Sequence, residues 1–201
     1  MHIELTEMLR CPAAHEDSVL VMSTGEMLGR MVRSGLLGCP VCQREYPIVR
    51  GVVQFAGPAA HRAGAAAPPP AARADAATLQ ALLDLSGPGG YVVLVGSAAR
   101  YAVGLAALMG GIHFVGVNAP PDVEEQPVLS LLAGAPTIPL RSAMARSVVV
   151  GADASVAPWL GEASRVLLPG RRAVIEDETL APPAGIARLA VGQGLWVGEK
   201  R

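Results

Sequence analysis

Aromatic and charged residues are scarce in this chain of 201 residues. Only 3% of its residues are aromatic and 16% are charged, whereas 51% are hydrophobic. A typical globular domain has about 25% charged residues. The formal net charge of −1 leaves no basic excess, so we do not expect nucleic-acid binding. Since so little charge cannot cover a whole surface, we expect the exterior to be small and neutral or partly covered by a partner protein.

Cysteine is also scarce. The three cysteines cannot form a complete disulfide framework, because their number is odd. The first residues carry acids and no basic segment, so the start of the sequence does not resemble a secretory signal. We therefore expect a protein of the reducing cytoplasm.

One segment is apolar enough to raise the question of a membrane span. Residues 91–117 contain only three strongly polar side chains, and their length could cross a bilayer. Arg100 would then lie inside the bilayer at a cost of about 3 kcal/mol, and glycines divide the segment into short elements. We expect buried strands and a helix here, and no transmembrane span. Attachment to the cytoplasmic face of a membrane complex remains open.

The chain divides into three parts. Residues 1–56 hold all the cysteines, and residues 57–77 are an Ala/Pro-rich stretch that we interpret as a linker. Residues 78–201 alternate short apolar runs with helical patterns, which is typical of a doubly wound α/β sheet. The predicted fold class is therefore α/β: a small β-rich domain followed by a Rossmann-like doubly wound sheet that ends in an antiparallel strand pair.

The third part can be divided further by its periodicity. Thr78 is a candidate N-cap, and residues 98–109, 123–132 and 156–167 are candidate helices. His113 lies in an apolar strand, where we expect a packed, hydrogen-bonded histidine. Gly192 and Gly194 favour a hairpin between the last two strands. The expected strands are residues 91–95, 112–117, 137–140, 147–150, 173–176, 186–191 and 195–197.

Two of the cysteines have the spacing of metal ligands. Cys39 and Cys42 frame a four-residue turn, in which two thiolates can hold one metal ion. Cys11 is the candidate third ligand, and position 14, where a fourth cysteine is expected, is Ala14. His15 could replace it and complete a Cys₃His zinc site, with His61 as a weaker candidate. The alternative is a site that has lost its metal and keeps three reduced thiols.

The first 56 residues resemble the small zinc-ribbon family of methyltransferase activator subunits. The likeness rests on residues 8–12, Met-Leu-Arg-Cys-Pro, and on residues 39–53, Cys-Pro-Val-Cys-Gln-Arg-Glu-Tyr-Pro-Ile-Val-Arg-Gly-Val-Val. Ala14 and Val53 depart from the family pattern, which has cysteine and proline there. The resemblance implies a β-rich module that docks on a methyltransferase-like domain and serves mainly as a scaffold.

The turn after the strand 91–95 has the place of a nucleotide-binding loop but not its glycines. In a Gly-x-Gly-x-Gly turn the backbone can approach a cofactor because glycine lacks a Cβ. Here only Gly96 matches, while Ala98 and Arg100 stand at the other two glycine positions. A methyl group and a guanidinium therefore occupy space that a ligand would need.

Residues 78–201 resemble the class I S-adenosylmethionine-dependent methyltransferases. The most specific stretches are residues 160–175 and the closing Gly-Leu-Trp-Val of residues 194–197. The resemblance implies an acid at the end of each of the first two strands, but these positions are Val95 and Asn118. If the chain still bound the cofactor, Gly96, Ala98 and Asn118 would contact it.

We therefore expect a non-catalytic accessory subunit of a larger protein assembly, built on a methyltransferase-like scaffold, with zinc but without S-adenosylmethionine. The alternative is an active methyltransferase with a divergent cofactor site. A further possibility is that the N-terminal module activates a separate methyltransferase in trans.

Overall fold

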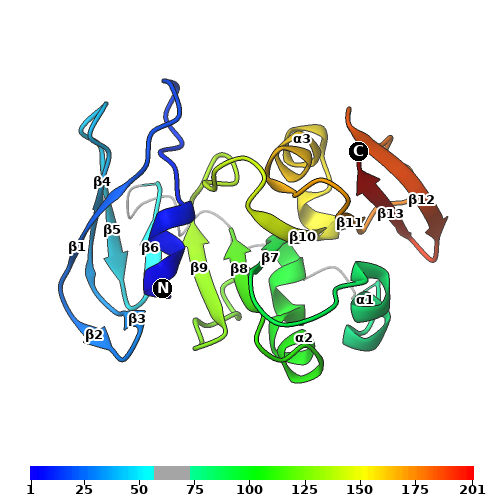
Figure 1. The fold of residues 1–201 in the computed structure, drawn as a ribbon, viewed down its shortest axis with the longest axis horizontal. Coiled ribbons are helices and arrows are strands. Elements are labelled where there is room, and N and C mark those ends of the chain that lie inside the picture. Colours follow the sequence, from blue (N-terminus) through cyan, green and yellow to red (C-terminus); the bar gives the residue numbers. More distant parts are fainter. Residues whose placement is uncertain (57–72) are drawn as a thin grey trace.

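A single large sheet runs through the whole molecule (Figure 1). The computed structural model describes residues 1–56 and 73–201, so most of the predicted linker 57–77 lies outside the described residues. The sheet has eleven strands in the order β1-β4-β5-β6-β9-β8-β7-β10-β11-β13-β12. The strands of the N-terminal part and those of the α/β part thus belong to one hydrogen-bonded surface.

The N-terminal part begins with the 3₁₀ helix η1 (Ile3–Met8) and is otherwise built of short strands. Four of them pair antiparallel in the large sheet, and β2 and β3 form a separate hairpin. The strands are β1 (Val21–Thr24), β2 (Met27–Leu28), β3 (Met31–Val32), β4 (Gly35–Gly38), β5 (Glu45–Val49) and β6 (Val52–Gln54).

The α/β part confirms the predicted fold class. Its first five strands are parallel, and β13 lies antiparallel between β11 and the edge strand β12. From β7 the chain first adds β8 and β9 on one side of this strand and then β10 and β11 on its other side. The strand order therefore reverses between β7 and β10, and α/β proteins commonly bind ligands at such a point. The strands are β7 (Tyr91–Val95), β8 (His113–Val117), β9 (Leu129–Ala133), β10 (Ala145–Val150), β11 (Arg172–Ile175), β12 (Ile186–Gly192) and β13 (Leu195–Lys200).

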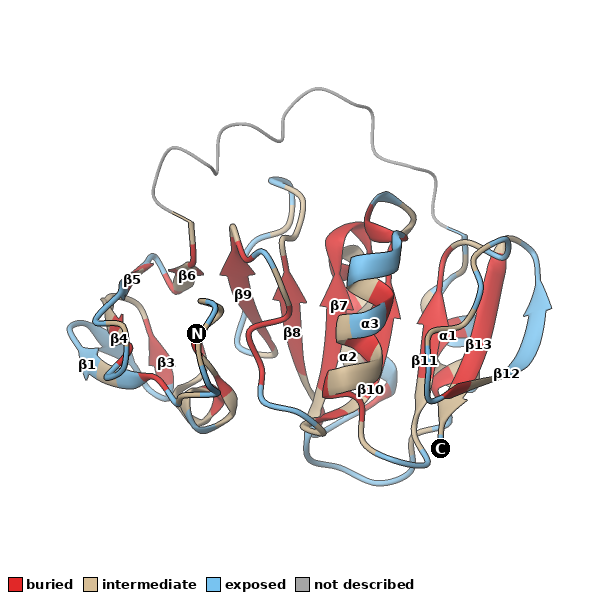
Figure 2. Ribbon diagram, turned by 90° about the horizontal axis from the view of Figure 1, so that it is seen from above, coloured by how far each residue is buried: buried red, intermediate tan, exposed pale blue. Residues whose placement is uncertain are grey.

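Helices cover both faces of this sheet, and Figure 2 shows the buried strands between them. The hydrophobic cluster on one face includes Leu79 of α1 (Ala76–Leu83) and Leu105 of α2 (Ala102–Leu108). The cluster on the other face includes Leu5 of η1 and Leu160 of α3 (Ala157–Val166). Successive residues of β7 alternate between the two clusters, as a strand buried on both faces requires.

Strand β6 joins the two parts of the chain. It pairs parallel with β9, with Val53 opposite Leu132, and the amide of Phe55 donates to the carbonyl of Ala133 at 2.8 Å. Val53 is fully buried. The N-terminal module therefore docks by extending the parallel sheet, and the edge of β9 is covered by the same chain.

Three local predictions were wrong. Residues 123–132 do not form a helix: Pro127 interrupts the pattern and β9 begins at Leu129. Residues 137–140 do not form a strand, apart from one isolated bridge between Leu140 and Leu9. The N-cap of α1 is Asp75, whose side chain accepts from the amide of Thr78 at 2.7 Å, so this helix starts inside the predicted linker.

His113 is packed and hydrogen-bonded, as predicted. Its Nε2 lies 3.2 Å from the hydroxyl of Ser130, and its ring centroid lies 4.5 Å from that of His2 and 5.5 Å from that of Tyr91. Burial, together with the neighbouring charge of His2, lowers the pKa of His113 to about 4. The folded protein therefore holds a neutral imidazole at the junction between the N-terminal segment and β8.

The stability of the protein is expected to fall as the pH drops from about 6.5 to about 4. In this window the unfolded chain binds a proton at His113, whose ordinary pKa is 6.5, and the folded chain does not. Because the side chain is only partly buried, the expected loss is about 1–2 kcal/mol. Urea unfolding at about pH 7 and about pH 4.5 measures it. If the variant His113→Asn loses as much stability between these two pH values as the original chain does, His113 is not the group responsible.

Candidate functional site

The four predicted metal ligands lie together in the N-terminal module. One ligand atom from each of Cys11, His15, Cys39 and Cys42 lies within 4.8 Å of the others. The Sγ atoms of Cys11 and Cys42 are 3.7 Å apart, and His15 Nε2 is 3.4 Å from Cys39 Sγ. Tetrahedral zinc with Zn–S bonds of about 2.3 Å places its sulfurs about 3.8 Å apart. The spacing of this cluster therefore fits a zinc ion; the weaker candidate His61 lies outside the described residues.

Two separate turns position these ligands. Cys39 and Cys42 lie in the turn between β4 and β5, closed by a bond of 2.9 Å from the amide of Gln43 to the carbonyl of Cys39. His15 follows the turn after Cys11, and its Nδ1 lies 2.5 Å from the carbonyl of Glu16. A proton on Nδ1 leaves the lone pair of Nε2 free, which is the tautomer that binds a metal through Nε2. His15 thus supplies the fourth candidate ligand, which the alanine at position 14 cannot provide.

The electrostatics of the two buried cysteines differ. Burial raises the pKa of the Cys11 thiol. Burial also acts to raise that of Cys39, but the backbone amides of Cys42 and Val41 outweigh it and lower the pKa of Cys39 to about 6. Because the thiolate is the form that binds metals, the turn between β4 and β5 prepares Cys39 for coordination.

The turn after β7 holds a side chain of the same protein. The 3₁₀ helix η3 (Gly96–Tyr101) starts there, and the carboxylate of Asp153 accepts from the Ser97 amide at 2.8 Å and from its hydroxyl at 2.6 Å. Asp153 belongs to η4 (Ala152–Ala154), which follows β10. A carboxylate is thus bound at the point where a Rossmann fold commonly holds the anionic part of a cofactor.

Two glycines make room for this contact. A Cβ on Gly96 would lie 2.6 Å from Asp153 Oδ1, and one on Gly151 would lie 2.3 Å from Ser97 Oγ and 2.7 Å from the Ala98 nitrogen. Gly96 also has φ +63°, where L side chains are strained. Gly96, the one glycine that the sequence shares with a nucleotide-binding turn, thus admits the protein's own carboxylate.

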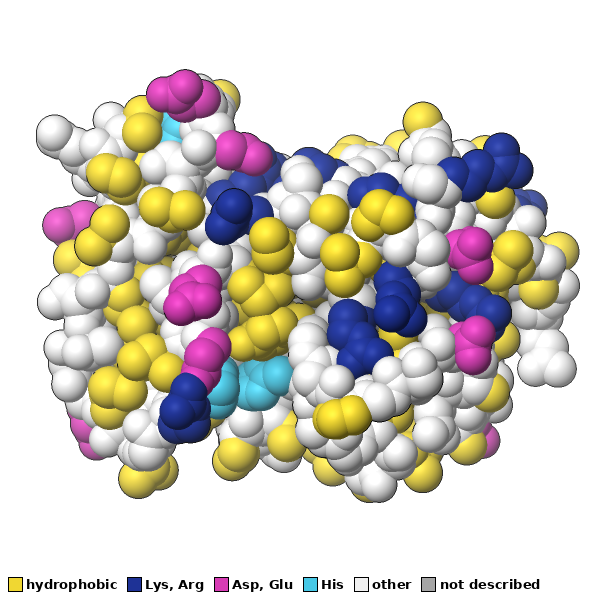
Figure 3. Space-filling model, in the orientation of Figure 1, with side chains coloured by type: hydrophobic (Ala, Val, Ile, Leu, Met, Phe, Trp, Pro, Cys, Tyr) yellow, Lys and Arg dark blue, Asp and Glu magenta, His cyan; other side chains and the backbone are white. Residues whose placement is uncertain are grey.

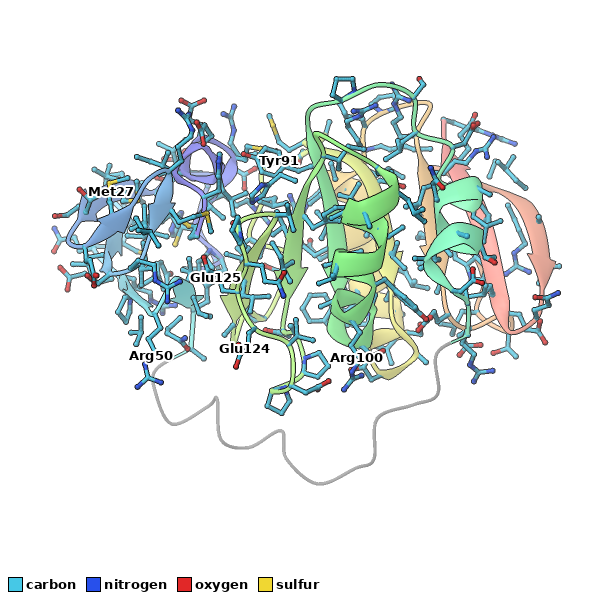
Figure 4. All side chains as sticks on the ribbon, turned by 90° about the horizontal axis from the view of Figure 1, so that it is seen from below. Met27, Arg50, Tyr91, Arg100, Glu124 and Glu125 are labelled. Atoms are coloured by element: carbon cyan, nitrogen blue, oxygen red, sulfur yellow. The ribbon has the colours of Figure 1, made fainter. Side chains whose placement is uncertain are left out.

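Other side chains near this turn are also paired within the chain. The guanidinium of Arg100 makes two bonds, of 2.8 and 2.7 Å, to the carboxylate of Asp122. The side-chain amide of Asn118 exchanges two bonds, of 2.8 and 2.9 Å, with the backbone of Ala135. Figure 4 places Arg100 and Tyr91 at opposite ends of the parallel strands. Of the residues predicted to contact a cofactor, Asn118 is hydrogen-bonded to Ala135, and Gly96 and Ala98 are buried.

The sequence did not indicate three members of this network. Buried Glu176, at the end of β11, accepts from the hydroxyl of Tyr101 at 2.5 Å and from the amide of Ala152 at 3.1 Å. The three residues are therefore Tyr101, Glu176 and Asp153, which bonds to Ser97. The available signal was the position of Glu176 as the last residue of the predicted strand 173–176 and of Asp153 three residues after the predicted strand 147–150, since the carboxyl ends of parallel strands meet at one edge.

Two hollows in the described residues 1–56 and 73–201 lie away from this turn. One of about 320 Å³ lies over β1 and β4, next to Cys39. The other, of about 110 Å³, lies between β6, β9 and residues 119–123. Neither is lined by Gly96, Ser97 or Asp153. Within the same described residues, no helix is both long enough and apolar enough to cross a bilayer.

No protein-family model matches the sequence, and no curated protein sequence is significantly similar to it. Among solved structures, the fold is similar to a chain of the complex between the Haloferax volcanii Trm112 methyltransferase activator and a methyltransferase, with 22% identity, 50% of each chain covered and a TM-score of 0.39. It is also similar to the antibiotic-resistance methyltransferase Kmr, with 16% identity, 63% of this chain and 93% of that one covered, and a TM-score of 0.43.

A third similar structure is geranyl diphosphate C-methyltransferase from Streptomyces coelicolor, with 16% identity, 50% of this chain and 41% of that one covered, and a TM-score of 0.40. The chain thus spans half or less of the length of the first and third of these proteins. At such identities and TM-scores the likeness carries no argument about function. The fold itself is a mixed α/β fold with a large sheet whose central strands are parallel and whose C-terminal pair is antiparallel.

Proposed function

We propose that this protein is a non-catalytic accessory subunit of a larger protein assembly in the reducing cytoplasm, and that it does not bind S-adenosylmethionine. The observation that carries the proposal is the occupation of the crevice after β7 by the chain's own side chains. Asp153 holds the Ser97 amide, and Arg100 is paired with Asp122. The alternative is an active methyltransferase with a divergent cofactor site.

The energetics favour the non-catalytic function. A cofactor in this crevice would have to displace the Asp153 carboxylate from its two hydrogen bonds to Ser97. Hydrogen bonds to charged groups are worth about 1.5–3 kcal/mol each, so their loss would cost roughly 3–6 kcal/mol. That cost weakens binding about 10²–10⁴-fold and would shift a micromolar dissociation constant toward the millimolar range or beyond.

Zinc in the cluster of Cys11, His15, Cys39 and Cys42 belongs to this proposal as a structural ion. Four protein ligands complete a tetrahedral shell and leave no open position for a substrate or water. Such an ion would fix the two turns of the N-terminal module relative to each other. The pairing of β6 with β9 supports a module that acts in cis rather than on a separate methyltransferase, because its strand already extends the sheet of its own chain.

Exposed hydrophobic side chains support a protein partner. Figure 3 shows hydrophobic side chains interspersed with charged ones over the visible face. The largest exposures are those of Leu28, at 73%, and Val21, at 61%, both in the N-terminal module. Leu189 and Val191 of the edge strand β12 are exposed by more than half. Leu189 and Val191 lie two residues apart, on one face of an edge strand, and such an apolar edge is suited to a protein partner.

Isothermal titration with S-adenosylmethionine tests the proposal. We expect no binding heat up to about 1 mM ligand, because the crevice is closed by charge-assisted contacts. S-adenosylhomocysteine, the product of methyl transfer, serves as a second ligand. Circular dichroism of the same sample establishes that the protein is folded. Micromolar binding of either ligand would contradict the proposal and favour the enzyme.

A further inference from the structure

A tyrosine hydroxyl contacts one sulfur of the cysteine cluster. Tyr46, on β5, is only 4% exposed, and its hydroxyl oxygen lies 3.2 Å from Cys11 Sγ. The ring packs against Phe55, with centroids 4.9 Å apart and planes at 45°. Tyr46 is therefore held from two sides, and its hydroxyl points at a candidate ligand rather than at solvent.

The direction of this hydrogen bond follows from the chemistry of a bound metal. A cysteine that ligates zinc is a thiolate and has no proton to donate. The tyrosine hydroxyl must then donate to the sulfur, and the bond is charge-assisted.

The charge of the zinc-bound cluster explains why a hydrogen bond from Tyr46 to Cys11 would be favourable. Three thiolates, one neutral imidazole and Zn²⁺ sum to a net charge of −1, and the sulfurs of Cys11 and Cys39 belong to residues that are only 3% exposed. Buried negative charge requires hydrogen-bond donors. Cys39 has the backbone amides of Val41 and Cys42, whereas Cys11 has the amide of Ala13 and the hydroxyl of Tyr46. Within the described parts of the chain, Tyr46 is the one side-chain hydroxyl that reaches a sulfur of this cluster.

We propose that Tyr46 is a positioning residue of the zinc site: its hydroxyl donates to the Cys11 thiolate and determines how tightly the metal is held. This inference rests on the proposed zinc site. Since the bond is charge-assisted only when Cys11 is a thiolate, it stabilises the metal-bound cluster more than the metal-free thiols. Partners of metal ligands typically change metal affinity 10–100-fold when they are removed.

The variant Tyr46→Phe tests this directly, because it keeps the ring on Phe55 and removes only the hydroxyl. We expect zinc affinity, measured by competition with a chromophoric chelator, to fall about tenfold or more. In the cobalt-substituted protein, the thiolate-to-cobalt charge-transfer band should shift to lower energy, because a sulfur that has lost a hydrogen bond is oxidised more easily. The matched control Tyr91→Phe, in the α/β part, should change neither reading.

The outcomes separate this inference from the proposal on which it rests. If Tyr46→Phe holds zinc as tightly as the original chain and the cobalt band does not move, the role of Tyr46 is refuted while the zinc site stands. If affinity falls but the band stays in place, Tyr46 acts only through packing, and the inference is again refuted. If the original chain takes up neither zinc nor cobalt, the zinc site itself is wrong.

Discussion

Replacing Cys39 by serine is expected to release the metal and to lower the free energy of unfolding by on the order of 5 kcal/mol. The binding free energy of a structural zinc ion is folding free energy, because the unfolded chain does not hold the ligands together. The Cys39 sulfur lies 3.4 Å from His15 Nε2, and serine cannot replace it as a soft ligand.

The loss should extend beyond the N-terminal module. Since β6 pairs with β9, loosening the module exposes the edge of the parallel sheet. Urea unfolding followed by tryptophan fluorescence reports on the α/β part, which contains Trp159 and Trp196. Metal content by mass spectrometry reports on the site. A Cys39→Ser protein that unfolds like the original chain would contradict a structural metal ion here.

The fourth ligand can be identified by a matched pair of variants. His15→Ala should lose the metal, because Nε2 of His15 lies within the cluster. His61→Ala should keep it, since the sequence alone offered His61 as a weaker candidate. Metal content of both variants decides between the two histidines. Retention in His15→Ala together with loss in His61→Ala would reverse the assignment.

Replacing Gly151 by alanine is expected to cost about 3 kcal/mol of folding free energy. The added Cβ would lie 2.3 Å from Ser97 Oγ and 2.7 Å from the Ala98 backbone nitrogen. Overpacking of this kind typically costs 1–3 kcal/mol or more, and here part of the obstacle is backbone, which cannot rotate away. The φ of Gly151 is −67°, which any residue adopts, so the cost comes from space and not from backbone strain.

Gly161→Ala is the matched control. Gly161 lies within α3, and a Cβ there meets no atom within 4 Å. Alanine favours a helix over glycine by up to about 1 kcal/mol, so this variant should be slightly more stable than the original chain. Urea unfolding of both variants gives the comparison. If Gly151→Ala were as well tolerated as Gly161→Ala, the contact between η4 and η3 would not be tightly packed.

These contacts connect stability with the proposed loss of function. The glycines at positions 96 and 151 let Asp153 reach Ser97, and under the proposed function this contact stands in place of a bound cofactor. Closing a crevice in this way adds hydrogen bonds inside the protein and removes a cavity, both of which favour the folded state.

Several features of this protein could be predicted from local sequence patterns alone. The apolar run at residues 91–95 predicted a strand buried on both faces, and Cys39 and Cys42 predicted a ligand turn. These signals are local because strand burial and turn spacing depend on residues close together in the chain. The helix predicted at residues 123–132 failed for the opposite reason: Leu129 to Ala133 are used by the sheet, and tertiary pairing overrides helical spacing.

The sequence by itself determined the α/β class, the antiparallel end of the sheet, the residues able to bind a metal, and the absence of the usual cofactor glycines. Only the tertiary structure brought Asp153 to Ser97, Asp122 to Arg100 and Tyr46 to Cys11. Each of these pairs joins residues from 22 to 56 positions apart, in different segments of the chain. Which distant side chains meet depends on the order in which strands pair and on what fills the space between them, and no local pattern encodes either.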